Sequence, residues 1–160
     1  MVSDKIPTDL LKYQLRKFQI KVAEESRSSY ITFVKKVWPD FVGGNHHKIY
    51  AQKLEDVSRG KLKRLIINMP PRHTKSEFAS HLFPAWMMGR NPKLKIIQTT
   101  HTAELSYNFG RKVRNLFDQQ EFKEVFPNVS LSQDSKAAGR FTTNKGGEYF
   151  AAGVGGAITG

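Results

Sequence analysis

The sequence predicts an α/β fold, in which a parallel sheet is flanked by helices and preceded by a helical N-terminal segment. The first 60 residues place their apolar side chains mostly at helical spacing. Residues 62–69 and 94–100 are short apolar runs of the length expected for buried strands, and each is followed by a helical pattern. The order strand, helix, strand, helix implies a right-handed βαβ crossover.

Three helices are expected in the N-terminal segment. From Thr8 to about Ser26, apolar residues recur every three or four positions. A second helix, "SSYITFVKKVW", is expected to stop before Pro39, and "PDFVGGN" is expected to form a loop. Helical spacing returns in "HHKIYAQKLEDVSRG", where Gly60 is placed to cap the helix C-terminus.

The next third of the chain carries the expected parallel unit. The run "LKRLIINM", residues 62–69, is expected to form the first strand, and a helix is expected from about Lys75. This helix should bend or end near Pro84, with Gly89 closing it. The run "LKIIQTT", Leu94–Thr100, is the second expected strand.

A long helix and a hairpin are expected in the last third. The stretch "TAELSYNFGRKVRNLFDQQ" has helical spacing, and its apolar side is formed by Leu105, Phe109, Val113, Leu116 and Phe117. The following stretch, "GRFTTNKGGEYFAAGVGG", alternates short β-prone pieces with "NKGG", which is typical of a hairpin turn.

Composition limits the class of partner. The 160 residues suit about one domain, with 26 Lys and Arg against 14 Asp and Glu and a formal net charge of +12. This charge favours nucleic acid as a partner, although a solvated basic surface is the alternative. The chain has no cysteine, which excludes disulfides and thiolate chemistry. No run of about 18 apolar residues occurs, so no membrane association is expected.

The stretch "NMPPRHTKSEF" lies between the first expected strand and the following helix. A helix start offers unpaired N–H groups and the positive end of the helix dipole, which together favour an anion. In the P-loop pattern G-x-x-x-x-G-K-[ST], such a turn binds phosphate. Lys75 and Ser76 fit this pattern, whereas Met69 and Thr74 occupy the two glycine positions. An ordinary strand-to-helix connection with a surface lysine is the alternative.

The stretch "RLIINMPPRHTKSE" resembles the variant Walker A segment of the large terminase subunits of tailed bacteriophages. The stretches "FVKKVWPDF", "HHKIYAQKLEDVSRG", "FPAWMMGRNPKLKII" and "GVGGAITG" agree with that family in order and spacing, so the resemblance extends from about Tyr30 onward. It implies a P-loop NTPase-type fold, with a helical segment at 1–60 and the first part of an ATPase core at 61–160. The domain would be incomplete, because the family continues after "GAITG" into the Walker B strand.

The resemblance implies roles for the residues of this loop. Lys75 and Arg72 would be catalytic and would contact the phosphates of ATP, and the Ser76 hydroxyl would be a ligand of Mg²⁺. Pro71 and the preceding Pro70 fix φ near −65° and would hold the loop open before the nucleotide arrives.

Other residues near the loop are candidates for contacts with the nucleotide. Thr74 stands where the family usually has glycine, and a β-branched residue is strained there by about 1–2 kcal/mol if φ is positive. His73 is a candidate contact to phosphate or ribose. The resemblance implies an adenine contact from an element upstream of the loop. The candidates for it are His46, His47 and Gln52, and surface decoration of a helix is the alternative. Glu77 is expected to complement the helix dipole.

By this resemblance, the chain would be the ATP-binding part of a viral DNA-packaging motor, with ATP and Mg²⁺ as cofactors. Expected partners are double-stranded DNA, a portal protein, a small terminase subunit and further copies of the chain in a homo-oligomeric ring. It would act in the host cytoplasm at the procapsid portal vertex, and the parent protein would also be an endonuclease.

The chain alone is expected to hydrolyse ATP poorly, because the Walker B strand and its acidic residues are missing from it. Two alternatives to the packaging motor stay open from the sequence. The first is another P-loop DNA translocase or helicase-like ATPase, and the second is a non-catalytic basic nucleic-acid-binding module.

Overall fold

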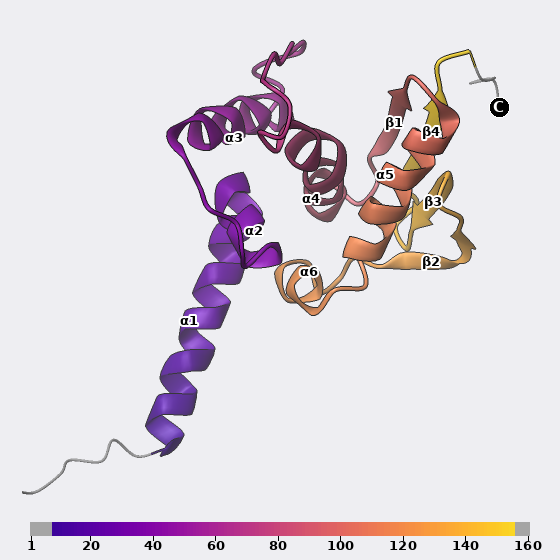
Figure 1. Ribbon diagram of the computed structural model, residues 1–160. Helices are drawn as coiled ribbons and strands as arrows, with labels where there is room; N and C mark the ends of the chain where they lie inside the picture. Colours follow the sequence, from indigo (N-terminus) through magenta and orange to yellow (C-terminus); the bar gives the residue numbers. More distant parts are fainter. Residues whose placement is uncertain (1–7, 156–160) are drawn as a thin grey trace, which may run out of the picture.

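The computed structural model describes residues 8–155, so the "GAITG" part of the expected C-terminal motif lies outside the described residues. The described chain is an α/β structure in which helices flank a four-stranded sheet (Figure 1). Its elements are α1 (Thr8–Ser28), α2 (Tyr30–Val37), α3 (Asn45–Ser58), η1 (Glu77–Leu82), α4 (Phe83–Arg90), β1 (Lys95–Thr100), α5 (Ala103–Leu116), α6 (Gln120–Val125), β2 (Leu131–Lys136), β3 (Arg140–Thr143) and β4 (Glu148–Gly153).

The three N-terminal helices form as predicted. The Ser29 side chain accepts a hydrogen bond from the Thr32 N–H and caps α2, which ends before Pro39. Gly60 follows α3 at φ 71°, a conformation that favours glycine, and its N–H donates to the Val57 carbonyl. The first helix, α1, extends away from the rest of the molecule (Figure 1). Among the described helices, none combines the length and apolar character that a membrane crossing requires.

The sheet is mixed, so the prediction of a parallel sheet is only partly correct. Its strand order is β1-β4-β3-β2. β1 pairs with β4 in parallel, from Lys95 opposite Glu148 to Thr100 opposite Gly153, whereas β3 is antiparallel to both β4 and β2. The hairpin of β3 and β4 turns at Gly146, where φ is 86°, as the "NKGG" signal predicted.

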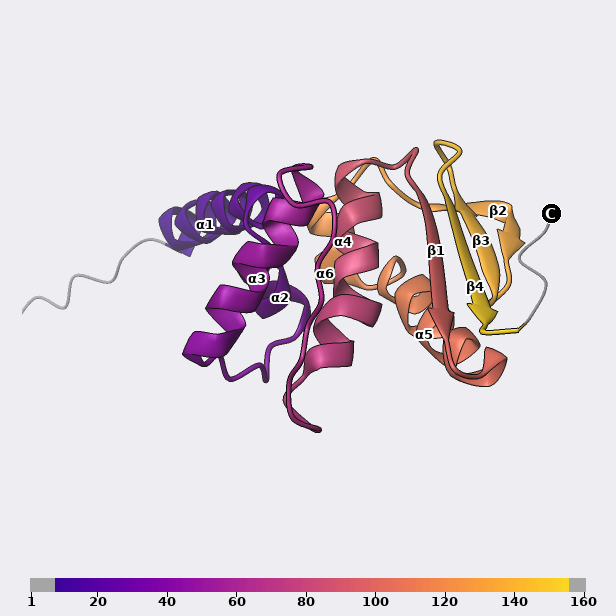
Figure 2. The same cartoon turned by 90° about the horizontal axis from the view of Figure 1, so that it is seen from above.

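The prediction of a strand at residues 62–69 is wrong. This segment is extended but pairs with no strand of the described chain, and it runs beside α3 and α4 instead (Figure 2). A groove of about 780 Å³ lies between Leu65 and β1, which is the other predicted strand. The parallel partner of β1 is therefore β4, and the expected crossover between the two apolar runs does not form.

The helix after the loop is continuous through Arg90, but its first part is wider than an α-helix. In η1, a π-helical turn, the Phe83 N–H donates to the Phe78 carbonyl five residues earlier. Pro84 follows in the first turn of α4. Proline has no N–H to donate and crowds the preceding turn, so a widened turn before Pro84 accommodates it. The sequence predicted that this helix bends or ends near Pro84. The helix does not end there and continues to Arg90.

Close backbone packing explains why α5 carries a glycine on its buried face. A Cβ atom at Gly110 would lie 2.0 Å from the Ala138 carbonyl oxygen, so a larger residue does not fit. The buried face of α5 consists of Ser106, Gly110, Val113 and Leu116, and it differs from the predicted stripe because Leu105 is 44% exposed. The sequence did not predict α6 or β2.

Aromatic side chains join the N-terminal helices to η1 and α4. The fully buried Tyr30 ring meets the Phe78 ring edge-on at 5.7 Å, and its hydroxyl donates to the Phe78 carbonyl at 2.6 Å. The Trp86 indole N–H donates to the Ser26 carbonyl at 2.8 Å. These contacts fix the helix that begins at the loop.

A domain boundary at residue 60 stays a prediction.

We expect Tyr30→Phe to lower the free energy of unfolding by about 1–2 kcal/mol, because it leaves the buried Phe78 carbonyl without the hydroxyl donor. Urea unfolding followed by circular dichroism measures this change. Tyr13→Phe is the control, since Tyr13 is 56% exposed and should change stability by less than about 0.5 kcal/mol. Equal effects of the two substitutions would contradict a stabilising role for the buried hydroxyl.

Candidate anion-binding site

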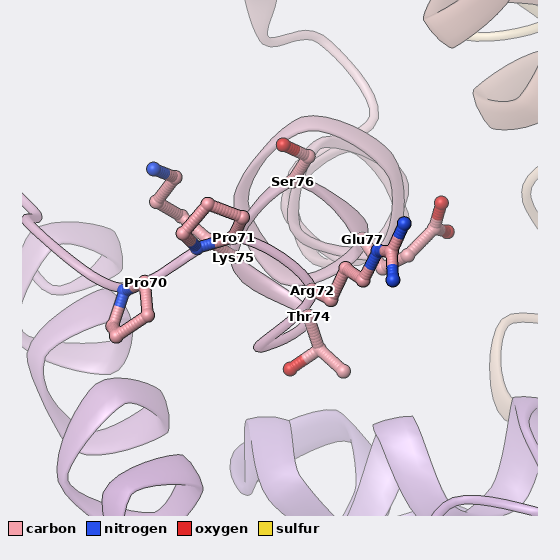
Figure 3. A pocket seen from close by; sticks show the side chains of 7 residues that line it. All are labelled: Pro70, Pro71, Arg72, Thr74, Lys75, Ser76 and Glu77. Carbon is pink, nitrogen blue, oxygen red and sulfur yellow. The ribbon is translucent and has the colours of Figure 1, made fainter.

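A hollow of about 480 Å³ opens at the turn that precedes η1 (Figure 3). The residues around it are Pro70, Pro71, Arg72, Thr74, Lys75, Ser76 and Glu77. The structure therefore brings together all the loop residues singled out from the sequence except His73. The two prolines hold the entry to the turn, and Ser76 and Glu77 lie where the helix begins.

The backbone of the turn has an unusual conformation for its sequence. Arg72 and Thr74 have φ values of 61° and 59°, and they are the only described non-glycine residues with positive φ. A left-handed residue followed by helical residues turns successive N–H groups toward one side, which makes a concave binding place for an anion. In the described chain, the N–H groups of Arg72, His73 and Thr74 donate to no protein acceptor.

Lys75 is held at its backbone while its side chain spans the turn. The Tyr50 hydroxyl donates to the Lys75 carbonyl at 3.0 Å, and burial raises the pKa of Tyr50 to about 12, so this hydroxyl keeps its proton. The Lys75 ammonium donates to the Met69 carbonyl at 3.4 Å, which is a long contact. A negatively charged phosphate can therefore compete for the ammonium group.

The sequence made His47 a candidate for contacting the adenine. In the structure, His47 contacts Thr74 of the loop and does not line the hollow. The Gly44 N–H donates to His47 Nδ1 at 2.9 Å, and His47 Nε2 lies 2.8 Å from Thr74 Oγ1. In Figure 3, the side chains of Thr74 and Ser76 point to opposite sides of the turn. The Thr74 hydroxyl thus faces His47 of α3, and Thr74 is also among the residues around the hollow.

The remaining candidates for nucleotide contacts are placed differently. Gln52 is exposed and its amide lies 3.4 Å from Asp56, so it does not reach the hollow. His73 is exposed, with Nδ1 2.9 Å from the Pro71 carbonyl. His46 lines a second, mostly apolar hollow of about 270 Å³, formed between α3 and residues 65–69. His46 is therefore the candidate that stays next to a space large enough for a flat ring.

Glu77 belongs to a charge network that the sequence analysis missed. Its carboxylate accepts a hydrogen bond from His81 at 2.8 Å and another from Lys112 on α5. The His81 hydrogen bond is the largest of the effects that lower the pKa of Glu77 to about 2. The i, i+4 spacing of Glu77 and His81 is visible in the sequence, whereas Lys112 is 35 residues away.

The charges of the site favour an anion that carries several negative charges. Arg72 and Lys75 contribute two cations at the hollow, while the one carboxylate there, Glu77, is paired with Lys112 and His81. Three or more metal-binding side chains gather nowhere in residues 8–155. A cation here would need ligands from the bound anion, with the Ser76 hydroxyl as a protein ligand.

Comparisons of the chain with protein families, with curated proteins and with solved structures return no match. The functional assignment therefore depends on the loop sequence and on the geometry around it.

The low pKa of Glu77 makes stability depend on pH. The pKa falls from the ordinary 4.5 to about 2 on folding, so the contribution of this carboxylate is complete above pH 4.5 and is lost as the pH falls toward 2. We expect Glu77→Gln to lower the free energy of unfolding by about 1 kcal/mol at pH 7, a value reduced for solvent screening because the side chain is one third exposed.

Urea unfolding at pH 7, 5 and 3 measures this effect, and the difference between wild type and Glu77→Gln should shrink at pH 3. The control is Glu24→Gln, which removes an exposed carboxylate of α1 that does not line the hollow. A difference that stays constant from pH 7 to pH 3 would contradict a lowered pKa of Glu77.

Proposed function

We propose that the chain binds ATP with Mg²⁺ and is the ATP-binding part of a DNA-packaging motor, the large terminase subunit of tailed bacteriophages. The observation that carries the proposal is the turn from Pro71 to Ser76, which opens on a hollow with Lys75 and Ser76 at the start of a helix. The likeness of this stretch to the variant Walker A segment supports the same interpretation. The finer fold assignment, a P-loop NTPase domain, is part of the proposal.

The chemistry of the hollow suits a triphosphate. Backbone N–H groups of the turn would bind phosphate oxygens, and Arg72 offers a planar group that can donate to two oxygens at once. Lys75 would exchange its long contact with the Met69 carbonyl for a phosphate oxygen. Both cations would oppose the charge that builds up on the transferring phosphoryl group, which is the catalytic role proposed for them.

Mg²⁺ would be held jointly by protein and nucleotide. The Ser76 side chain lines the hollow, and its hydroxyl would bind the cation together with phosphate oxygens and water. When bound, Mg²⁺ would neutralise charge on the phosphates. The adenine ring would extend toward α3, where His46, Ile49 and Tyr50 line the second hollow.

DNA as a partner is supported by the charge of the chain, which is +12. The helix α5 presents the exposed Arg111 beside Lys112, which links this helix to Glu77 at the hollow. The portal protein, the small terminase subunit, the homo-oligomeric ring and the place of action at the procapsid vertex follow from the resemblance and are proposals. A helicase-like translocase with the same loop is the second candidate function.

We expect Lys75→Ala to weaken the binding of a fluorescent ATP analogue at least tenfold in the presence of Mg²⁺, since a tenfold loss corresponds to about 1.4 kcal/mol and a charged hydrogen bond contributes about 1.5–3 kcal/mol. Fluorescence titration measures the dissociation constant. The control is Lys35→Ala, which removes one exposed positive charge on α2 and should change the affinity less than about twofold.

Equal affinities of wild type and Lys75→Ala, or no binding by the wild type, would contradict the proposal. DNA binding that persists without nucleotide binding would favour a non-catalytic basic nucleic-acid-binding module.

A further inference from the structure

We propose that His47 is a positioning residue of the loop, which holds the Thr74 hydroxyl and so stabilises the left-handed backbone on which phosphate binding depends. The inference rests on the proposed function, because it assigns to His47 a role in shaping the proposed phosphate site. It differs from the adenine contact expected for this residue. His47 would act through Thr74 without touching the nucleotide.

The hydrogen bonds around His47 determine its tautomer. The Gly44 N–H can only donate, so His47 Nδ1 must accept this hydrogen bond and carries no proton. The proton of the neutral ring therefore lies on Nε2, which donates to Thr74 Oγ1 at 2.8 Å. Thr74 Oγ1 donates in turn to the His73 carbonyl at 2.7 Å. Each donor in this series has an acceptor, so the network is complete with a neutral imidazole.

The backbone conformation of Thr74 requires stabilisation by side-chain hydrogen bonds. A β-branched residue crowds the backbone when φ is positive, and φ at Thr74 is 59°. Glycine would adopt this conformation without a side chain to restrain. With threonine at this position, the two hydrogen bonds of the hydroxyl fix the side chain and favour the observed turn over an ordinary one.

His47 is itself rigidly placed, which a positioning role requires. The side chain is buried, since its relative exposure is 5%. Its ring lies 4.8 Å from the Phe41 ring and 5.2 Å from the Phe78 ring. One turn further along α3, the Tyr50 hydroxyl donates to the Lys75 carbonyl at 3.0 Å. Helix α3 therefore holds the loop at two successive residues, Thr74 and Lys75.

Release of Thr74 would change the site without unfolding it. If Thr74 returned to negative φ, the N–H groups of Arg72, His73 and Thr74 would no longer turn to the same side as the start of the helix, and the anion would lose donors. The loss should depend on the residue at position 74. With glycine there, the turn is accessible without the imidazole, so the contribution of His47 should largely disappear.

A double-mutant cycle tests this dependence, with His47→Ala, Thr74→Gly and the double variant titrated with a fluorescent ATP analogue and Mg²⁺. We expect His47→Ala to raise the dissociation constant about tenfold when residue 74 is threonine, which corresponds to about 1.4 kcal/mol. In the Thr74→Gly background, the same substitution should raise it less than about twofold. Lys48→Ala is the matched control, because Lys48 follows His47 on α3 but is exposed, lines neither hollow and makes no hydrogen bond to Thr74.

Two further variants separate positioning from simple packing. His47→Gln keeps an amide that can donate to Thr74 and should recover part of the affinity that His47→Ala loses. Thr74→Val keeps the β-branched shape but removes the hydroxyl, so it should bind the nucleotide at least as weakly as His47→Ala. A purely structural role of the ring would give equal losses for His47→Gln and His47→Ala, and this result would overturn the inference.

A pH profile provides an additional test. Burial, with the neighbouring His46 and His73 adding repulsion, lowers the pKa of His47 from its ordinary 6.5. Protonation of Nδ1 removes the acceptor for the Gly44 N–H, so nucleotide affinity of the wild type should fall as the pH is lowered below the ordinary 6.5 and through the lowered pKa of His47. His47→Gln lacks this group and should lose less affinity over the same range. Parallel pH profiles of the two proteins would contradict the inference.

Failure of this inference can be distinguished from failure of the proposed function. If the wild type binds the analogue and His47→Ala weakens binding equally with threonine or glycine at position 74, the positioning role is refuted while the nucleotide site stands. If the wild type binds no analogue, thermal unfolding of the same four proteins decides. His47→Ala should then lower the unfolding midpoint by about 2–4 °C when residue 74 is threonine and by less than half of this in the Thr74→Gly background. Equal shifts would refute the positioning role there too.

Discussion

The candidate site depends on one backbone constraint, the left-handed conformation of Thr74 at the start of a helix. Arg72 has the same conformation two residues earlier, so the turn contains two residues that are each disfavoured by about 1–2 kcal/mol. Strain of this kind persists only where the surroundings over-determine the backbone. Here the surroundings are α3, which contacts Thr74 and Lys75, and two prolines that restrict the approach to the turn.

The helix that follows the turn is tightly packed, and this packing keeps the turn in its strained conformation. Phe78 is fully buried, and its carbonyl accepts a hydrogen bond from the Tyr30 hydroxyl. Its ring packs against the Tyr50 ring, with 5.4 Å between the ring centroids. Phe78 thus joins α2, α3 and η1 at one point, four residues after Thr74. The widened turn of η1 lies directly behind the site, as such turns often do at functional positions.

Local signals predicted most helices, the hairpin and β1 correctly, because caps, turns and periodicity act within a few residues. The prediction of a strand at 62–69 was wrong because an apolar run does not specify which strand it pairs with. A strand forms only where a neighbouring strand completes its backbone hydrogen bonds. Ile66 illustrates this, since it is 87% exposed despite lying in the most apolar part of the run. The strand β2, "LSQDSK", was missed because its polar sequence carries no strand pattern, and it is defined by pairing with β3.

The loop was predictable because its residues are consecutive in the sequence, whereas the residues that support it are not. His47 and Gln52 were both candidates for one role, although five residues on an α-helix correspond to about 500°, so these side chains point some 140° apart. Helical geometry alone therefore indicates that only one of them can face the loop. That His47 is the one follows from tertiary packing, because the ring fills the space between Phe41 and Phe78. The contact between Lys112 and Glu77 likewise follows from tertiary packing, because it joins α5 to a residue at the edge of the hollow that lies 35 positions earlier in the sequence.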